Sequence, residues 1–460
     1  MNALLTNLLV TTVLGTAAGG AGAPLTLDQA LARAHQANAR LPVAALDPRI
    51  AEQRVREAQA RRRITLSTDG DLWIAPGNGY DPVVTDRGDE RLQVVAEKTV
   101  YDGGALRGRE HQARSDVRVA EARYRQAVAD VDLEVRDSFA RLLAARGEVE
   151  VRQKGLGRLR HYVNLLEQRV RAGQPLASDL LSARVRMASD SAALADARGR
   201  VDDARAALDV LMGSPPDAPL VVAALPPPAP PSGPAAAETA GEAAEKSPGE
   251  ASEPSGPSHR GSGDAELADV AAARQAAESA GAGLTAARAE RSPVVTLRAD
   301  AGLWGSDPLH AVPSDLAARH PGATFGDRLK RDAGYSLMVD VHLPLFDTGG
   351  VAARIAQAEL SLEQARRSLD LVRTEADLQR EQARRALASA YEQYQTLSAA
   401  IPVARDAYLD AESRYWGGTG TYLQVLDAFS TAVDTAVQQA QAALAYREAE
   451  ARVLRWGGTP

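Results

Sequence analysis

The 460-residue chain contains no cysteine and few aromatic residues. The lack of cysteine excludes disulfides, thiolate metal sites, thiol chemistry and an N-terminal lipid-anchoring cysteine. Aromatic side chains make up 4% of the residues, so we expect close packing of alanine-rich helices in place of a large globular core. Beyond the N-terminus, no stretch approaches the roughly 18 apolar residues of a membrane helix. The net charge of −7 argues against nucleic acid as the main partner.

Residues 1–23 have the pattern of a secretory signal peptide. A short leucine-rich core is followed by small residues that end in Ala21-Gly22-Ala23, as at a cleavage site. No Lys or Arg precedes the core, and Pro24 is a poor residue just after a cut, so cleavage after Ala18 or Ala21 fits as well. The alternative interpretation is a disordered N-terminus.

The stretch 101–213 occurs twice in the chain. When its numbering is shifted by 245 residues (346 minus 101), this stretch falls without a gap on 346–458. The shift pairs Gly104 with Gly349, Gly173 with Gly418, and Gly213 with Gly458. A constant offset over more than a hundred residues indicates an internal duplication. The domains expected from it are a first repeat at 24–213 and a second at 265–458.

Each copy encodes a very long helix, a tight turn and a second helix. Apolar residues after Ala113 recur at steps of three and four, as in a coiled-coil seam. No proline interrupts 105–173, and at 1.5 Å per residue such a helix spans roughly 100 Å. The turn Gly173-Gln174-Pro175 ends it. The expected helices are 104–172 and 178–212 in the first copy, and 350–416 and 422–456 in the second.

Amphipathic hairpins precede both long helices. The expected strands are 63–73 and 92–101, then 294–304 and 335–346, with apolar and polar residues alternating along each of them. Their length and pattern are typical of transmembrane β-strands. Four strands cannot close around a polar lumen, and open edges are not tolerated in lipid. Several copies of the chain are therefore needed, and three would supply twelve strands.

Residues 214–264 separate the two halves and are rich in Pro, Ala, Ser and Gly. Such a composition cannot bury enough apolar surface to offset its ordering entropy, so we expect a disordered insertion. A proline-rich ligand for a partner protein is the alternative.

This arrangement resembles the TolC-like outer-membrane efflux proteins over residues 24–458, apart from the insertion. The motifs that carry the resemblance are the mature start Leu25-Thr26-Leu27-Asp28-Gln29-Ala30-Leu31, the strand-to-helix joints at 100–104 and 345–350, and the helix-tip turns at 169–173 and 414–418. Each motif alone is weak, but their order on a duplicated scaffold is specific.

The resemblance implies an α+β membrane protein that forms a homotrimer. Twelve strands would cross the outer membrane as a β-barrel, and twelve helices would continue it as a periplasmic tube. The implied function is the outer-membrane channel of a tripartite efflux or type I secretion system. Implied partners are outer-membrane lipid, a periplasmic adaptor (membrane fusion) protein and an inner-membrane pump of the RND, ABC or MFS type.

The resemblance also implies a gate at the periplasmic tip. Matched residue by residue, the latch tyrosine is Tyr415 and its carboxylate partner is Asp179. The family's ring of aspartates falls at Gln424 and Asp427, and its latch arginine falls at Gly420. The turn glycines Gly173 and Gly418, and the joint glycines Gly103, Gly104, Gly349 and Gly350, are expected to adopt φ values that other residues resist.

No catalytic constellation accompanies these features. The seven histidines are scattered without metal-ligand spacing, and Gly417-Gly418-Thr419-Gly420 follows no strand, which excludes a phosphate-binding loop. We therefore assign no enzyme activity, cofactor or metal. Trp73 and Trp304, at matching strand ends, suit an interfacial aromatic belt. The competing hypothesis is a periplasmic coiled-coil scaffold or adaptor without a pore, which leaves the hairpins unexplained.

Overall fold

The computed structural model describes residues 24–74, 88–174, 176–215, 220–231, 267–308, 310–346 and 348–457. The expected signal peptide, 1–23, lies outside them, as do Pro175 and most of the expected insertion. The chain divides into two compact units. One comprises Met1–Ala45, Tyr124–Ala268 and Arg373–Pro460; the other comprises Leu46–Arg123 and Asp269–Val372.

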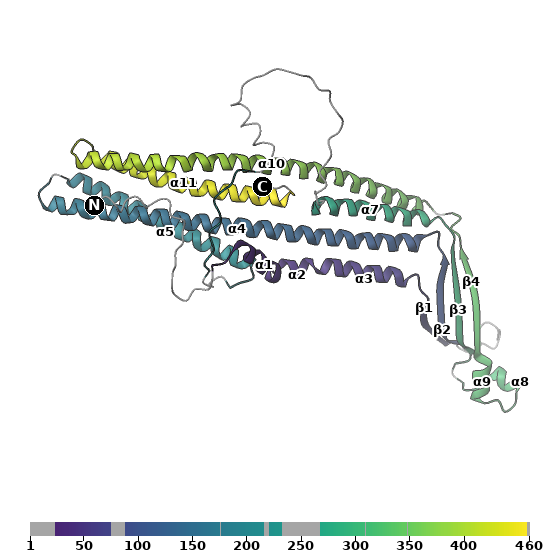
Figure 1. Cartoon of the computed structure of the whole chain (residues 1–460). Helices are drawn as coiled ribbons and strands as arrows, with labels where there is room; N and C mark the ends of the chain where they lie inside the picture. The colour runs from purple at the N-terminus through teal and green to yellow at the C-terminus, as the bar shows by residue number, and fades with distance from the viewer. Residues whose placement is uncertain are drawn as a thin grey trace, which may run out of the picture. The chain divides into compact units, whose positions relative to one another are not determined.

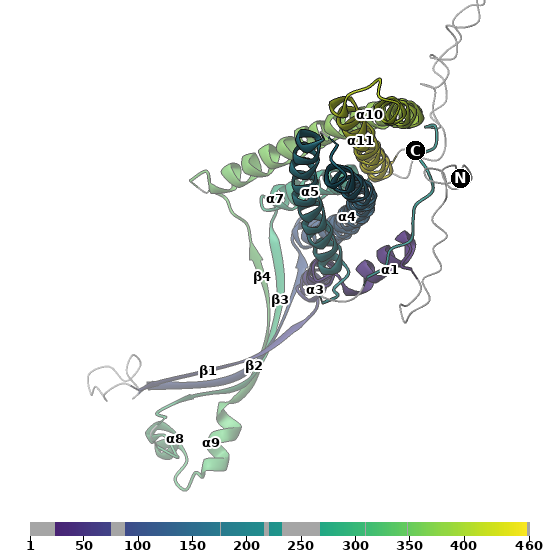
Figure 2. The same cartoon turned by 90° about the vertical axis from the view of Figure 1, so that its left-hand side faces the viewer.

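The second of these units contains a four-stranded antiparallel sheet (Figure 2). Its strands, in spatial as well as sequence order, are β1 (Thr65–Ile74), β2 (Gly88–Tyr101), β3 (Val294–Ser306) and β4 (Ala333–His342). The corresponding expected ranges were 63–73, 92–101, 294–304 and 335–346. The register is regular, with Leu66 opposite Ala96, Ala96 opposite Ala299, and Ala299 opposite Leu337. β1 and β4 are the edge strands.

The two faces of the sheet differ in chemistry. One face carries Leu66, Leu72, Leu92, Leu337 and Val339, all between 55% and 73% exposed. The other is polar: the Ser336 hydroxyl lies 2.9 Å from both carboxylate oxygens of Asp300. On that polar face Gln93 and Asp300 are buried. The apolar face is thus the exposed one, the reverse of a sheet made for water.

The tryptophans at the strand ends lie on the polar face. Arg91 pairs with Asp71 on one side and with Trp304 on the other, and Trp73 is opposite Asp89. An aromatic belt would require them on the apolar face, because only that face suits contact with lipid. The expectation of a lipid-facing belt from Trp73 and Trp304 is therefore wrong.

Helices surround the start of the long helix in the same unit. α4 (Ala105–Arg171) begins there beside α3 (Leu46–Ala60) and α7 (Ala268–Ala289), and α10 (Gly350–Trp416) begins there too (Figure 1). Glu110 of α4 pairs with Arg62 and, at 2.6 Å, with Arg114. These guanidinium groups hold the pKa of the Glu110 carboxyl below its usual value, with Arg62 contributing most.

The other unit contains α1 (Leu27–Ala37), α2 (Arg40–Ala44), α5 (Ala177–Leu211) and α11 (Tyr422–Arg455), with the remainder of α4 and α10. Thr26 and Gln29 form a capping box at the start of α1, as the motif Leu-Thr-Leu-Asp-Gln favours. Leu31 of α1 packs with Val135 and Phe139 of α4 and with Leu208 of α5. In the described part of the chain, no helix has the length and apolarity needed to cross a membrane.

Residues 220–231 are packed against this unit, in contrast to the disordered insertion expected for 214–264. Val222 forms a parallel bridge with Leu25, and the carbonyl of Leu220 accepts a hydrogen bond from Arg146 at 2.5 Å. Further along, the carbonyls of Pro226 and Ala229 accept from Arg447 and from the Tyr446 hydroxyl. Proline has no N–H to satisfy, so the proline-rich part of this segment can dock through its carbonyls, whereas the N–H of Ala223 donates to the carbonyl of Leu25. Residues 216–219 and 232–266 lie outside the described chain.

The duplication is not gap-free at its end. α5 ends at Leu211 with Gly213 at φ 65°, and α11 ends at Arg455 with Gly457 at φ 71°. Both glycines occupy the left-handed position that ends a helix. Gly457 is therefore the counterpart of Gly213 in place of the expected Gly458, because α11 is one residue shorter than α5 (34 against 35 residues).

Candidate functional site at the helix turns

Two helix turns of one unit form the candidate site. α4 ends at Arg171 and α5 begins at Ala177; α10 ends at Trp416 and α11 begins at Tyr422. Gly173 has φ 85° and Gly418 has φ 77°, the left-handed conformation expected for both. The amide of Gly418 donates to the carbonyl of Tyr415 at 3.1 Å. A Cβ at either glycine would meet no neighbour within 4 Å, so backbone conformation alone accounts for glycine there.

Tyr415 and Asp179 are joined by a hydrogen bond. The Tyr415 hydroxyl, near the end of α10, donates to Oδ2 of Asp179, in the first turn of α5, at 3.0 Å. Burial raises the pKa of the Tyr415 phenol, and the bond to Asp179 raises it further. The hydroxyl therefore keeps its proton at neutral pH and acts as donor. An acidic residue in the first helical turn is also favoured by the helix dipole.

Aromatic rings surround this bond. The ring of Tyr162 stacks on that of Tyr422 with centroids 5.2 Å apart, and lies 5.4 Å from Trp416 and 6.2 Å from Tyr415. The Arg169 guanidinium lies 4.1 Å from the centre of the Trp416 ring, within the range of a cation–π contact. Burial raises the pKa of Tyr162 and Tyr422. The cluster joins α4, α10 and α11, so it fixes the turns against one another.

The remaining residues matched to the gate lie on or near the first turn of α11. The Gln424 side chain accepts from the amide of Thr421 at 3.0 Å, as part of a capping box. Asp427 is exposed, and its backbone carbonyl accepts from Thr431. At Gly420 a Cβ would lie 3.1 Å from Cβ of Arg414. A side chain at this position would therefore require Arg414 to shift by a few tenths of an ångström.

The strand-to-helix joints differ in their use of glycine. Gly103 has φ 64°, whereas Gly104 and its counterpart Gly349 both have φ 94°. The carboxylate of Asp102 accepts from the amides of Gly104 and Leu106 and caps α4. Gly350 is the first residue of α10 and is not among the glycines with positive φ. The expectation that Gly350 adopts such a φ is therefore wrong, because a first helical residue takes ordinary helical dihedrals.

The sequence reasoning missed the aromatic cluster. Tyr162 lies next to the seam residue Val163 and was not assigned a role. The signal available was the density of aromatics at 408–429 in a chain with only 4% aromatic residues. Among the described residues, no group of three His, Asp or Glu is placed to hold a metal ion.

Comparison with known proteins identifies a matching family and a relative that has the same description. The family described as outer membrane efflux protein matches residues 91–214 and 265–459. The chain is 24% identical over 433 residues to the outer membrane efflux protein BepC of Brucella suis biovar 1 (strain 1330), covering 92% of this chain and 83% of BepC.

Two solved structures have the same fold. One is CusC, from a study of conformational changes during folding and transmembrane channel formation. Its structure matches this chain with a TM-score of 0.76 at 19% identity, over 94% of this chain and 92% of CusC. The likeness to the outer membrane protein VceC of Vibrio cholerae has a TM-score of 0.74 at 21% identity and covers 94% of this chain and 96% of VceC.

Proposed function

Because this chain belongs to the outer membrane efflux protein family, we propose that three copies of it form a continuous duct, gated at its periplasmic tip. The protein is an outer-membrane efflux channel that extends into the periplasm. Substrate enters at the tip, passes through the helical tube and leaves through the barrel. No step requires chemistry, and no residue of the candidate site is assigned a catalytic role.

The single observation that carries the trimer is the four-stranded sheet itself. Its apolar face is exposed, its polar face carries ion pairs such as Arg298 with Asp69, and its edge strands β1 and β4 each have one unpaired side. Unpaired edges are not tolerated in lipid. Pairing β1 of one copy with β4 of the next satisfies both edges, and four strands from each of three copies give twelve.

The proposed gate is the bond between Tyr415 and Asp179 together with the aromatic cluster around it. The bond links α10 to α5 across the two turns, so opening the tip would break it. Asp427, exposed on α11, is proposed to face the passage and to favour cations there. Gln424 offers no charge for that role, and its side chain is used in the helix cap.

The proposed partners are a periplasmic adaptor protein and an inner-membrane pump of the RND, ABC or MFS type, which dock at the tip. The pump would select the substrate, and the duct would conduct it. The same assembly could serve tripartite efflux or type I secretion. The apolar face of the sheet contacts outer-membrane lipid.

Membrane fractionation followed by planar-bilayer recording tests this proposal. We expect the protein in the outer-membrane fraction as a heat-resistant oligomer, and discrete conductance steps after reconstitution. A periplasmic scaffold without a pore would instead remain in the aqueous fraction and give no steps. Either of these results would overturn the proposed channel.

The charge at Asp427 gives a second test in the same recordings. Replacing the carboxylate (Asp427→Asn) should lower cation selectivity and weaken block by multivalent cations, because a carboxylate in a narrow passage attracts them. Asp203→Asn, exposed near the end of α5 that is farther from the turns, is the control and should change neither. Unchanged selectivity in the Asp427 variant would remove this residue from the passage.

A further inference from the structure

The connection between β3 and β4 contains two helices that the strand pattern did not predict. They are α8 (Ser314–Arg319) and α9 (Phe325–Asp332), the latter with a Thr324–Asp327 capping box. The first hairpin has no described counterpart, because residues 75–87 lie outside the described chain. α9 lies at the far end of the strands from the long helices of the same unit (Figure 1).

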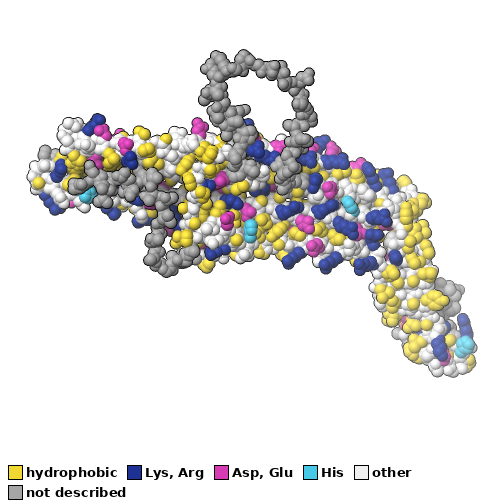
Figure 3. Space-filling view, viewed as in Figure 1, with side chains coloured by type: hydrophobic (Ala, Val, Ile, Leu, Met, Phe, Trp, Pro, Cys, Tyr) yellow, Lys and Arg dark blue, Asp and Glu magenta, His cyan; other side chains and the backbone are white. Residues whose placement is uncertain are grey.

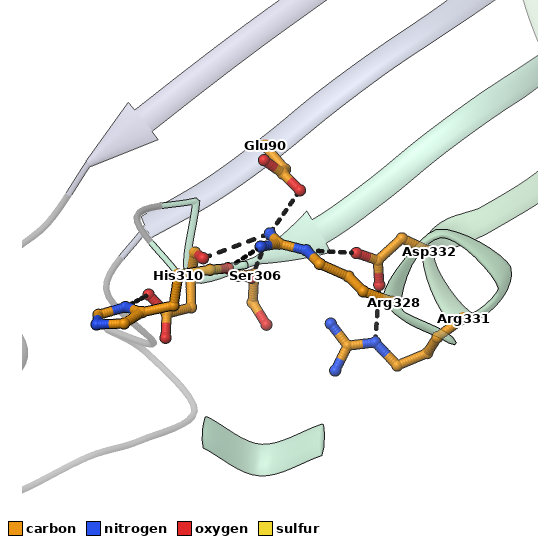
Figure 4. Close-up of polar contacts among 7 residues, drawn as sticks. Glu90, Ser306, His310, Arg328, Arg331 and Asp332 are labelled. Atoms are coloured by element: carbon orange, nitrogen blue, oxygen red, sulfur yellow. Dashed lines mark hydrogen bonds and ion pairs between the residues drawn. The ribbon is translucent and has the colours of Figure 1, made fainter. Parts of the chain in front are cut away.

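Arg328 joins α9 to the sheet through ion pairs and hydrogen bonds. Its guanidinium bonds Glu90 of β2 at 2.6 Å, Asp332 at 3.3 Å and the carbonyl of Ser306 at 3.2 Å (Figure 4). The side chains of Arg328 and Asp332 are each only 4% exposed. Removing Arg328 would leave Glu90 without this partner, whereas Asp332 would keep its ion pair with Arg331 at 2.7 Å. The position of α9 therefore depends on Arg328.

The face of the sheet that α9 covers is the apolar one. Glu90 is opposite Leu72 on one side and Gly305 on the other, and a Cβ at Gly305 would lie 2.6 Å from the Asp332 carboxylate. Strand residues two apart share a face, so Leu92 and Leu303 are on this face as well. Two carboxylates lie at this end of the apolar face, Glu90 of the sheet and Asp332 of α9, and Arg328 pairs with both.

A groove of about 460 Å³ lies between α9 and the sheet, and both apolar side chains and charged groups, among them Glu90, Arg328 and Asp332, line it. Leu72, Leu92 and Leu303 line it from the strands, and Phe325 and Leu329 line it from α9. Phe325 and Leu329 are 55% and 39% exposed, and their i, i+4 spacing places them on one side of the helix. Lys330, with a side chain 84% exposed, is on another side. Hydrophobic side chains cover the strand region up to the tip, where basic groups begin (Figure 3).

We propose that α9 is a lipid-anchoring helix at the membrane surface, with an acyl chain of an outer-membrane lipid in the groove against Phe325 and Leu329. The inference rests on the proposed function, in which the apolar face of the sheet contacts lipid. The groove is continuous with that face through Leu72 and Leu92, which identifies lipid as its occupant. A short amphipathic helix with Phe and Leu on one side and Lys on another suits the membrane interface, and Lys330 can extend to the headgroups.

Site-directed fluorescence quenching tests the proposal, since the cysteine-free chain allows a single label. Phe325→Cys, Leu337→Cys and Met338→Cys are each labelled with a small fluorophore in the full-length protein, reconstituted into phosphatidylcholine vesicles. Leu337 is on the apolar face and Met338 on the polar face. The quenchers are acyl-brominated phosphatidylcholine, which acts in lipid, and iodide, which acts in water.

We expect brominated lipid to quench the labels at 325 and 337 to a comparable extent, and iodide to quench the label at 338. Lipid quenching at 337 with only iodide quenching at 325 would overturn the anchoring helix and leave the proposed channel intact. Protection at 325 from both quenchers would also overturn it, since protein would then occupy the groove. Absence of lipid quenching at 337 would contradict the proposed channel and the inference together.

A paired variant tests the role of Arg328. In the background of the label at 325, Arg328→Gln should cause loss of quenching by brominated lipid, because α9 is then no longer held against the sheet. Lys330→Gln, on the exposed side of α9, is the matched control and should preserve the quenching. Unchanged lipid quenching in the Arg328 variant would overturn the assignment of Arg328 as the group that positions the helix.

Discussion

The Tyr415 hydroxyl donates to the carboxylate of Asp179, and this bond ties the end of α10 to the start of α5. The resemblance to efflux proteins placed both residues in a latch, and in the structure they are in contact. The residue matched to the arginine of that latch is Gly420, so the resemblance implies no ion pair at this position. The closed tip should therefore depend on one hydrogen bond and on aromatic packing.

The first prediction concerns this bond. Tyr415→Phe combined with Asp179→Ala should raise single-channel conductance in planar bilayers. A hydrogen bond to a charged group contributes about 1.5–3 kcal/mol, so its loss should favour the open tip by about tenfold or more. Tyr391→Phe is the control, because the Tyr391 hydroxyl contacts only Gln395 of its own helix among the bonds described. Unchanged conductance of intact oligomers would exclude the bond as a latch.

Asp137 of α4 is a second residue with a measurable signature. Burial, with Glu448 nearby, raises the pKa of its carboxyl from 3.8 to about 6. A raised folded-state pKa means that the native state keeps this proton up to a higher pH than the unfolded state does. The resulting cost to stability is absent below pH 4, grows as the pH rises, and is complete above about pH 6.

Asp137→Asn should therefore stabilise the protein above pH 6 and not at pH 4. Because Asp137 is only partly buried, solvent screening reduces the effect, and the gain is on the order of 1 kcal/mol. The measurement is the thermal unfolding midpoint by circular dichroism at both pH values, with the exposed Asp203→Asn as control. An equal gain at pH 4 would show that charge on Asp137 is not the cause.

At the scale of elements, the long helices follow from the sequence and the connections do not. The helices expected at 104–172 and 350–416 occur at Ala105–Arg171 and Gly350–Trp416, because seam periodicity and glycine stops are local signals. The packing of 220–231 depends on Arg146, Tyr446 and Arg447 far away in sequence. Composition alone cannot reveal such contacts. The helices α8 and α9 were missed because, at six and eight residues, they are too short for a helical pattern to stand out in the sequence.

The sequence predicts a bend or local loosening at Gly155, Gly157 and Pro402, because glycine and proline weaken a helix interior. Both long helices run without interruption through these positions. A bend there stays a prediction. The structure gives Gly155 another role: a Cβ would lie 3.3 Å from the Val433 side chain and 3.5 Å from Phe429. At Gly157 a Cβ would meet nothing within 4 Å.

Gly157→Ala should consequently stabilise the protein by about 0.5–1 kcal/mol, because alanine has the higher helix propensity and no neighbour opposes it. Gly155→Ala should gain less or lose stability, since Val433 must move. Chemical denaturation of the two variants side by side measures the difference. An equal gain at both positions would show that α11 does not approach α4 closely at Gly155.

The segment 220–231 yields a prediction that separates it from the rest of the 214–264 stretch, for which the sequence predicts a disordered insertion. Replacing 232–261 by a Gly-Ser linker of equal length should leave folding and assembly intact, because a sequence rich in Pro, Ala, Ser and Gly can bury little apolar surface. Replacing 220–231 in the same way should lower the unfolding midpoint, since it removes the Leu25–Val222 bridge and the acceptors of Arg146, Tyr446 and Arg447. Equal midpoints for the two replacements would contradict this assignment.

At the scale of the whole molecule, the proposed channel requires several copies of the chain, each of which supplies part of the barrel. The family, the location in the outer membrane and the duplicated plan could be recognised from motifs in order along the sequence. The edges of the sheet and its exposed apolar face are known only from the strand register, because the register determines on which face each strand residue lies. The same register places Trp73 and Trp304 on the polar face. The alternation of side chains along each strand gives the same result, because it puts the tryptophans and the leucines on different faces of the sheet.

The most direct test of the trimeric duct is the number of chains in the particle taken from the membrane. Native mass spectrometry of the protein released from outer membranes in detergent measures that number. We predict three copies of the mature chain, because three are needed to pair every β1 with a β4 around a twelve-stranded barrel. A stable monomer or dimer in that fraction would leave sheet edges unpaired in lipid and would contradict the account.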